Sequence, residues 1–108
     1  MTSNAPKSEI LNMSGLAEYQ TGAVVSRQIT KAEGGNVTLF AFDEGQELSE
    51  HTAPYDALVH VLEGEVEITI SGKAYRLKAA EGIIMPANAP HGLHAVKKFK
   101  MLLTMIRA

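Results

Sequence analysis

The chain has 108 residues, which is enough for one domain with one hydrophobic core. Its formal net charge is -2 and 20% of its residues are charged, so no basic face is large enough to bind nucleic acid nonspecifically. The chain contains no cysteine, which excludes disulfides and thiolate metal sites.

Residues 1–20 are polar and mixed in character, and they predict an N-terminal tail or a segment that two copies exchange in a dimer. Within them, Ser14–Tyr19 has the composition of a helical turn or an edge strand. The chain lacks the basic start and apolar run of a secretory signal, and no stretch approaches the ~18 apolar residues of a membrane helix. We therefore expect a cytoplasmic protein with no membrane partner.

Seven short runs that are rich in β-branched or alternating apolar residues predict β-strands. The turns between them supply glycine, which adopts positive φ at little cost, and no long amphipathic helix is evident. This pattern favours an all-β sandwich or barrel. The predicted strands are residues 23–29, 36–42, 57–62, 65–70, 74–77, 82–85 and 99–106.

The last predicted strand is apolar on both faces. Phe99, Met101 and Leu103 alternate with Leu102, and Ile106 lies on the same face as Leu102. A strand of this kind needs a second cover, and a homodimer would provide it. We therefore predict that the chain is a homodimer.

Two segments resemble the two histidine motifs of the cupin family. The first motif aligns through Gly45, His51 and Gly64, with Ala53 in the position of its second histidine and Ala57 in the position of its glutamate. The second motif aligns through Pro86 and His91, and Ala80, Asn88 and Ala95 replace its two glycines and its asparagine. The resemblance extends over about residues 36 to 106.

The resemblance implies an all-β cupin double-stranded β-helix, a jelly-roll barrel, formed by residues 21–108 as a single domain. In metal-binding cupins two histidines, a glutamate and a third histidine hold iron, manganese, nickel, copper or zinc. Here alanines replace two of those four ligands, and two imidazoles alone do not define a coordination geometry. The motif therefore does not support tight binding of an isolated metal ion.

The resemblance directs His51 and His91 into the barrel cavity, and we interpret them, with Tyr55 as a lid, as the ligand pocket. Their imidazoles would act as a general base or as hydrogen-bonding groups on a bound ligand, or would bind a divalent metal weakly while water or substrate completes its coordination shell. The alternative is that water and neighbouring backbone satisfy both imidazoles. Asp56 would orient a histidine or cap a turn, and both Tyr55 and Asp56 alternatively belong to a solvated loop.

His60 and His94 are the other two histidines. Side chains alternate between the faces of a strand, and each lies three residues beyond a position that the motif directs inward, namely Ala57 and His91. Both should therefore point away from the cavity. Only a β-bulge would bring His60 to the site as an additional metal ligand.

Three functions are compatible with this sequence. The first is a barrel that binds a small molecule without an obligatory, tightly bound metal. The second is a metal-dependent dioxygenase, isomerase or decarboxylase that uses a reduced site of two histidines, with Fe, Mn, Ni, Cu or Zn as cofactor. The third is a barrel that serves only assembly. Because fold and function are separable, the sequence does not identify the ligand or the reaction.

Overall fold

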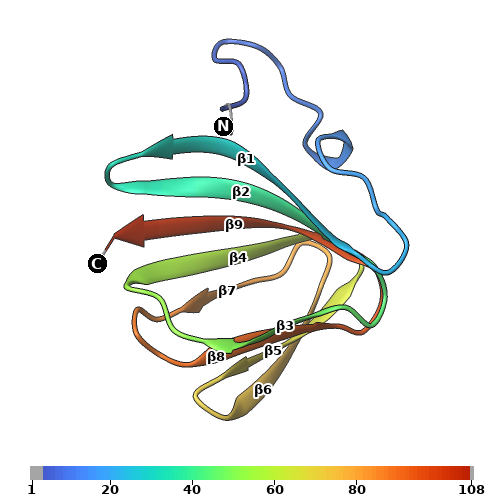
Figure 1. Ribbon diagram of the computed structural model, residues 1–108, viewed down its shortest axis with the longest axis vertical. Helices are drawn as coiled ribbons and strands as arrows, with labels where there is room; N and C mark the ends of the chain where they lie inside the picture. The colour runs from blue at the N-terminus through green and yellow to red at the C-terminus, as the bar shows by residue number, and fades with distance from the viewer. Residues whose placement is uncertain (1–3, 108) are drawn as a thin grey trace.

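The computed structural model describes residues 4–107, which form nine β-strands and one short 3-10 helix, η1 (Figure 1). No helix among these residues is both long and apolar enough to cross a membrane. The bounds are η1 Met13–Gly15, β1 Val24–Ala32, β2 Gly35–Phe42, β3 Glu47–His51, β4 Tyr55–Glu63, β5 Glu65–Ile70, β6 Lys73–Lys78, β7 Gly82–Met85, β8 His91–Ala95 and β9 Phe99–Arg107.

The strands form two antiparallel sheets that face each other (Figure 1). The larger sheet has the order β1-β2-β9-β4-β7, and the smaller sheet has the order β3-β8-β5-β6. Strands that are distant in sequence, such as β2 and β9, are therefore neighbours in the sheet. This arrangement confirms the predicted all-β jelly roll.

The main core fills the space between the two sheets. Alternation along the strands places one face of each inward, as Val66, Ile68 and Ile70 show on β5. The rings of Phe42 and Phe99 stack within this core, with centroids 4.6 Å apart. Aromatic and aliphatic burial on this scale is the main source of the barrel's stability.

A second apolar cluster covers the outer face of the larger sheet. Leu39 and Ala41 of β2 are buried there, and Leu102 of β9 is packed against the same cluster. The cover comes from the chain's own N-terminal segment through Ala5, Ala17 and the side chains around them, so Leu102 obtains a cover without a second copy. Ile106, the other outward residue considered above, remains 60% exposed.

Hydrogen bonds and cation–π contacts fix the N-terminal segment to the barrel. The Tyr19 hydroxyl donates to Glu63 Oε2 at 2.7 Å, and the ammonium groups of Lys98 and Lys100 lie 5.0 and 4.9 Å from the Tyr19 ring centroid. Buried Lys100 also donates to the Ser14 carbonyl. The N-terminal segment therefore packs on the barrel through Ala5, Ala17 and Tyr19, while Ile10 between them stays exposed. Residues 1–3 of the predicted tail lie outside the described part of the chain.

Candidate functional site

His51 and His91 lie side by side on the smaller sheet. His51 ends β3 and His91 begins β8, and the two residues are register partners. Their ring centroids are 4.4 Å apart in an edge-to-face arrangement. His91 is only 4% exposed, whereas His51 is exposed. The structure thus brings together the two histidines that the sequence analysis selected.

A register shift in β3 turns His51 toward the interior. Leu48 pairs with Leu93, and both pack in the main core. His51 lies three residues beyond Leu48 and would point outward on a regular strand, but the shift between them lets it pair with His91. Gly92 lies against this irregularity, since a Cβ at Gly92 would lie 3.2 Å from the Leu48 carbonyl oxygen. The bulge is therefore the local feature that forms the histidine pair.

Each imidazole is oriented by a backbone carbonyl two residues earlier in the chain. His51 Nδ1 lies 2.8 Å from the Ser49 oxygen, and His91 Nδ1 lies 2.9 Å from the Ala89 oxygen. A carbonyl oxygen only accepts hydrogen bonds, so in the neutral rings each Nδ1 carries the hydrogen and donates it. This assigns the tautomer and leaves a lone pair on each Nε2.

The turn before His91 is hydrogen-bonded to the loop between β3 and β4 and to the start of β4. The Ala87 N–H donates to Asp56 Oδ1 at 2.9 Å, and the Asn88 N–H donates to the Ala53 oxygen at 2.8 Å. Asn88 itself has a φ of 65°. The Asp56 carboxylate therefore holds the turn that carries His91. Sequence reasoning offered this role for Asp56 only as one of several.

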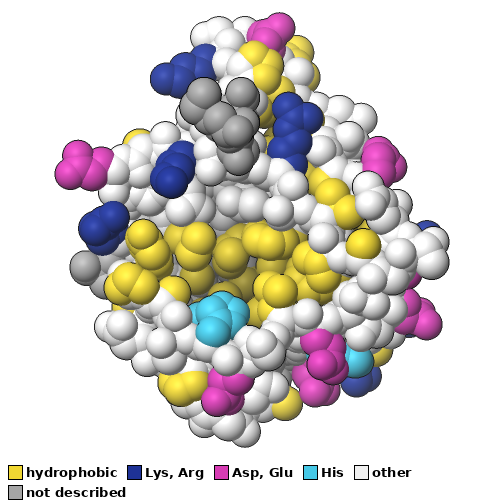
Figure 2. Space-filling model, in the orientation of Figure 1, with side chains coloured by type: hydrophobic (Ala, Val, Ile, Leu, Met, Phe, Trp, Pro, Cys, Tyr) yellow, Lys and Arg dark blue, Asp and Glu magenta, His cyan; other side chains and the backbone are white. Residues whose placement is uncertain are grey.

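The inner face of the larger sheet beside the histidines is apolar. Ala57 lies between Met105 of β9 and Met85 of β7 in the register, and all three side chains pack in the main core. Figure 2 shows a hollow lined with hydrophobic side chains between the sheets, with a histidine at its rim. Four further residues pack against the main core and are partly buried: Phe40, Leu48, Ala89 and Leu103.

Tyr55 begins β4 and has the same strand parity as buried Ala57, so it faces inward at the open end of the barrel. Its register partner is Arg107, whose guanidinium lies 5.8 Å from the Tyr55 ring centroid. The structure thus places the predicted lid residue at the barrel mouth, where it is half-buried beneath an exposed cation.

His60 and His94 point away from the interior. His60 is exposed between buried Val59 and Val61, and its register partner is Leu102 of the outer cluster. His94 is exposed between buried Leu93 and Ala95, and its Nδ1 lies 2.8 Å from Glu47 Oε1. The expected outward direction of both is confirmed, so His60 does not join the histidine pair in this arrangement.

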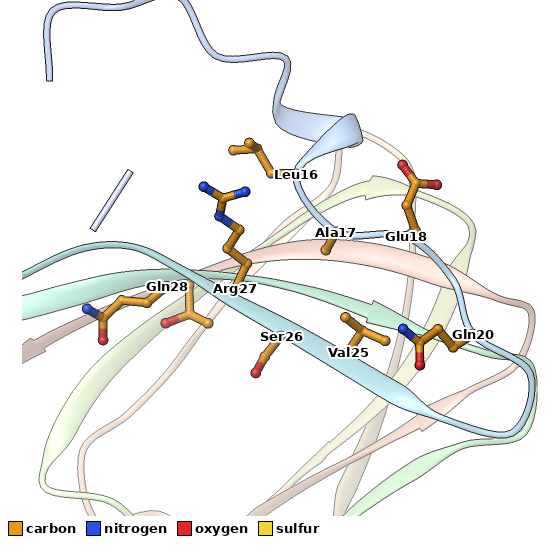
Figure 3. Close-up of a pocket in the computed structure, with 9 residues that line it drawn as sticks. Leu16, Ala17, Glu18, Gln20, Val25, Ser26, Arg27 and Gln28 are labelled. Carbon is orange, nitrogen blue, oxygen red and sulfur yellow. The ribbon is translucent and has the colours of Figure 1, made fainter. Parts of the chain in front are cut away.

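A separate groove lies between the N-terminal segment and β1 (Figure 3). Leu16 and Glu18 line one side of it, and Val25 and Arg27 line the other. Arg27 points from β1 toward the segment near Leu16 (Figure 3). The lining contains no histidine, so this groove is distinct from the histidine pair.

The residues present do not fit a tightly held metal ion. Within residues 4–107, no group of three or more His, Cys, Asp or Glu side chains is arranged to hold one. The positions of the two missing motif ligands are occupied by the methyl groups of Ala53 and Ala57. Two imidazoles with free Nε2 atoms are what this donor set offers.

Comparison with known proteins decides the family. The sequence pattern of the cupin domain family matches residues 38–107, which is more than half of the chain. This chain is a cupin. The match begins inside β2 and includes β3 and β8, the strands of the histidine pair.

Solved structures of other cupins share this fold. A conserved protein of unknown function from Streptococcus pyogenes is 34% identical, with 99% of this chain and 94% of that chain covered and a TM-score of 0.91. A cupin superfamily protein from Desulfitobacterium hafniense is 26% identical, with coverages of 100% and 99% and a TM-score of 0.90. Both neighbours match the cupin over nearly its whole length.

One curated relative has a name that refers to an activity. "Polyketide synthase CurC" from Streptomyces cyaneus is 33% identical to the cupin over 61 residues. The matched region is 56% of this chain and 40% of that relative. The cupin thus matches less than half of the relative's length.

Proposed function

We propose that this cupin binds a small, partly apolar molecule in the barrel and holds its polar group with the imidazoles of His51 and His91. The proposal requires no tightly bound metal. Tyr55, at the barrel mouth, would cover part of the bound molecule. Pockets that are mainly apolar and contain a few convergent polar groups are typical of small-molecule sites.

The observation that carries the proposal is the pairing of two imidazoles, 4.4 Å apart, beside an apolar interior. Ala57 stands where the family's glutamate would stand, and its neighbours in the register are the flexible side chains of Met85 and Met105. Methionine adapts its shape to a ligand at low cost. The site therefore suits a molecule with an apolar body and a small number of polar atoms.

The curated relative supports one class of ligand. Polyketides are carbon frameworks that carry oxygen functions, which matches an apolar cavity with few polar contacts. We infer that polyketide-like molecules are suitable first candidates, although the relative's name describes a protein of which the cupin matches 40%.

Thermal unfolding with naphthol, a neutral apolar probe, tests the proposal. A ligand at a hundred times its Kd stabilises the folded state by about 2.7 kcal/mol, which raises the Tm of a domain of this size by about 10 °C or more. Ala57→Leu adds bulk next to Met85 on the inner face of the larger sheet and should weaken the shift. Ala32→Leu, at an exposed position on β1, is the matched control. No shift with naphthol or with oxygenated aromatic relatives of it would contradict the proposal.

The alternative function is a metal-dependent enzyme with the same two histidines. It is favoured by the free Nε2 atoms, because metal-bound histidines commonly donate their other ring N–H to a carbonyl. Titration with Zn²⁺, Ni²⁺ and Fe²⁺ by calorimetry distinguishes it from the main proposal. Stoichiometric binding that His51→Ala abolishes would support the alternative, and weak binding that His51→Ala leaves unchanged would remove it.

A further inference from the structure

The two imidazoles present the same hydrogen-bonding character to a ligand. Because both Nδ1 atoms donate to backbone carbonyls, both Nε2 atoms of the neutral rings are acceptors. Within residues 4–107, no protein group donates a hydrogen bond to either Nε2. The site thus offers two hydrogen-bond acceptors, the Nε2 atoms of His51 and His91, to a donor on a ligand.

The two acceptors lie within reach of one small molecule. The ring centroids are 4.4 Å apart, and a nitrogen of a five-membered ring lies less than one bond length from the centroid of its ring. Two adjacent hydroxyl groups on one ligand, or one hydroxyl and a water, can therefore address both rings. The apolar side chains of Met85, Met105 and Phe40 line the interior on the facing sheet and favour an aromatic or other apolar frame.

We propose that the barrel selects uncharged ligands that carry hydroxyl donors, such as a phenol or a catechol, and that these hydroxyls donate to Nε2 of His51 and His91. This inference rests on the proposed function and names the chemical class of its ligand. A carboxylate would bring only lone pairs to the two acceptors, and its desolvation would go uncompensated at the neutral imidazoles.

Arg107 is a cation near the site that could attract a ligand carboxylate. Its guanidinium lies over Tyr55 at the end of β9, two residues beyond Met105, and it is exposed to solvent. A ligand carboxylate at the barrel mouth would pair with Arg107 rather than with the histidines. The relative affinity of a hydroxyl ligand and a carboxylate ligand therefore shows whether the histidine pair or Arg107 directs binding.

Calorimetry with three matched ligands, in the presence of EDTA, tests the inference. The ligands are propylcatechol, its dimethyl ether and propylbenzoate, which share an apolar body and differ in the polar group. Two hydrogen bonds are worth about 1 to 3 kcal/mol, so the catechol should bind about fivefold or more tightly than the ether and the benzoate. In His51→Ala this preference should fall to within about threefold. His94→Ala removes an outward imidazole and should leave the preference unchanged.

The outcomes of this experiment distinguish hydroxyl recognition from ligand binding in the cavity. Equal affinities for the catechol and the ether would overturn hydroxyl recognition and leave cavity binding intact. Tighter binding of the benzoate than of the catechol would also overturn hydroxyl recognition, and it would indicate that Arg107 binds the ligand. Absence of binding for all three would overturn both proposals. Because His91 is buried, exposed His51 is the safer residue to replace.

Nitrogen NMR of the histidine side chains tests the acceptor assignment without any ligand. In alkaline buffer, long-range proton–nitrogen spectra should show protonated Nδ1 and unprotonated Nε2 for His51 and His91. Hydrogens on Nε2 of both rings would overturn the inference.

Discussion

Two glycines with the same backbone conformation differ sharply in their surroundings. Gly64 and Gly72 both have a φ of 84°, a region that other residues rarely adopt. A Cβ at Gly64 would lie 2.0 Å from the Lys98 oxygen and 2.6 Å from Phe99 Cα, whereas a Cβ at Gly72 would meet nothing within 4 Å. The glycine at the end of the first cupin motif is thus required by the close approach of another strand as well as by its φ.

This difference predicts unequal effects of the same substitution. Gly72→Ala should lower the free energy of unfolding by about 1 to 2 kcal/mol, since it adds only the strain of positive φ. Gly64→Ala adds a clash with backbone that flexible side chains cannot relieve, so we expect a loss of about 3 kcal/mol or more. Urea unfolding of both variants measures this, and equal losses would contradict the explanation.

Sequence reasoning identified the two inward-facing histidines but not what orients them. The cupin motif directs His51 and His91 into the barrel, and strand alternation gave the outward direction of His60 and His94, which the structure confirms. The β3 bulge was not predicted, because nothing in Ser49 or Glu50 signals an extra residue. The tautomers depend on carbonyl directions, which sequence patterns do not encode.

The sequence pattern predicted the apolar strands well but missed the polar strands. The predictions for residues 65–70 and 82–85 match β5 and β7, and the other five lie within a few residues of observed strands. β3 and β8 were not predicted, although they carry the histidine pair. The sequence of β3, Glu-Leu-Ser-Glu-His, has one apolar residue, so its pairing is set by the rest of the barrel rather than by its own pattern.

The N-terminal segment contains the clearest pH-sensitive contact. Burial, the hydrogen bond to Glu63 and the charge of Glu63 together raise the pKa of Tyr19 above its ordinary value near 10.0. A raised pKa in the folded state means that the contribution of the neutral phenol to stability is complete below pH 10 and is lost as the pH rises above it.

Tyr19→Phe tests this contact. Near neutral pH the variant should be less stable by about 1 to 2 kcal/mol, because it loses a hydrogen bond to a charged acceptor. The difference from the unmodified protein should shrink as the pH rises beyond about 10. Chemical unfolding across this range measures it, with Tyr75→Phe as the control. A difference that stays constant at alkaline pH would contradict the assignment.

One outer face of the cupin keeps exposed apolar side chains. Leu58, Ile84 and Ile106 are 42%, 61% and 60% exposed. Leu58 pairs with Ile84, and both lie on the outer face of the larger sheet with Ile106 on neighbouring β9. The N-terminal segment packs over the β1-β2 side of this face. A patch of this kind is suited to self-association about a two-fold axis.

We therefore expect the cupin to be a homodimer that pairs through this patch. Size-exclusion chromatography with light scattering should give twice the chain mass, and Ile84→Arg should shift the protein to a monomer. Thr21→Arg, at an exposed position in the turn before β1, adds the same single charge and is the control. A monomeric parent protein at micromolar concentration would refute the expectation.

The recognisable family sequence is shorter than the unit that folds. A chain trimmed to the matched region would start at Thr38, within β2, and would lose β1 together with the segment that covers Leu39 and Ala41. Such a fragment would expose a hydrophobic sheet face and a bare strand edge, both of which promote aggregation. Domain boundaries chosen for expression should therefore retain the polar opening residues, despite their unremarkable composition.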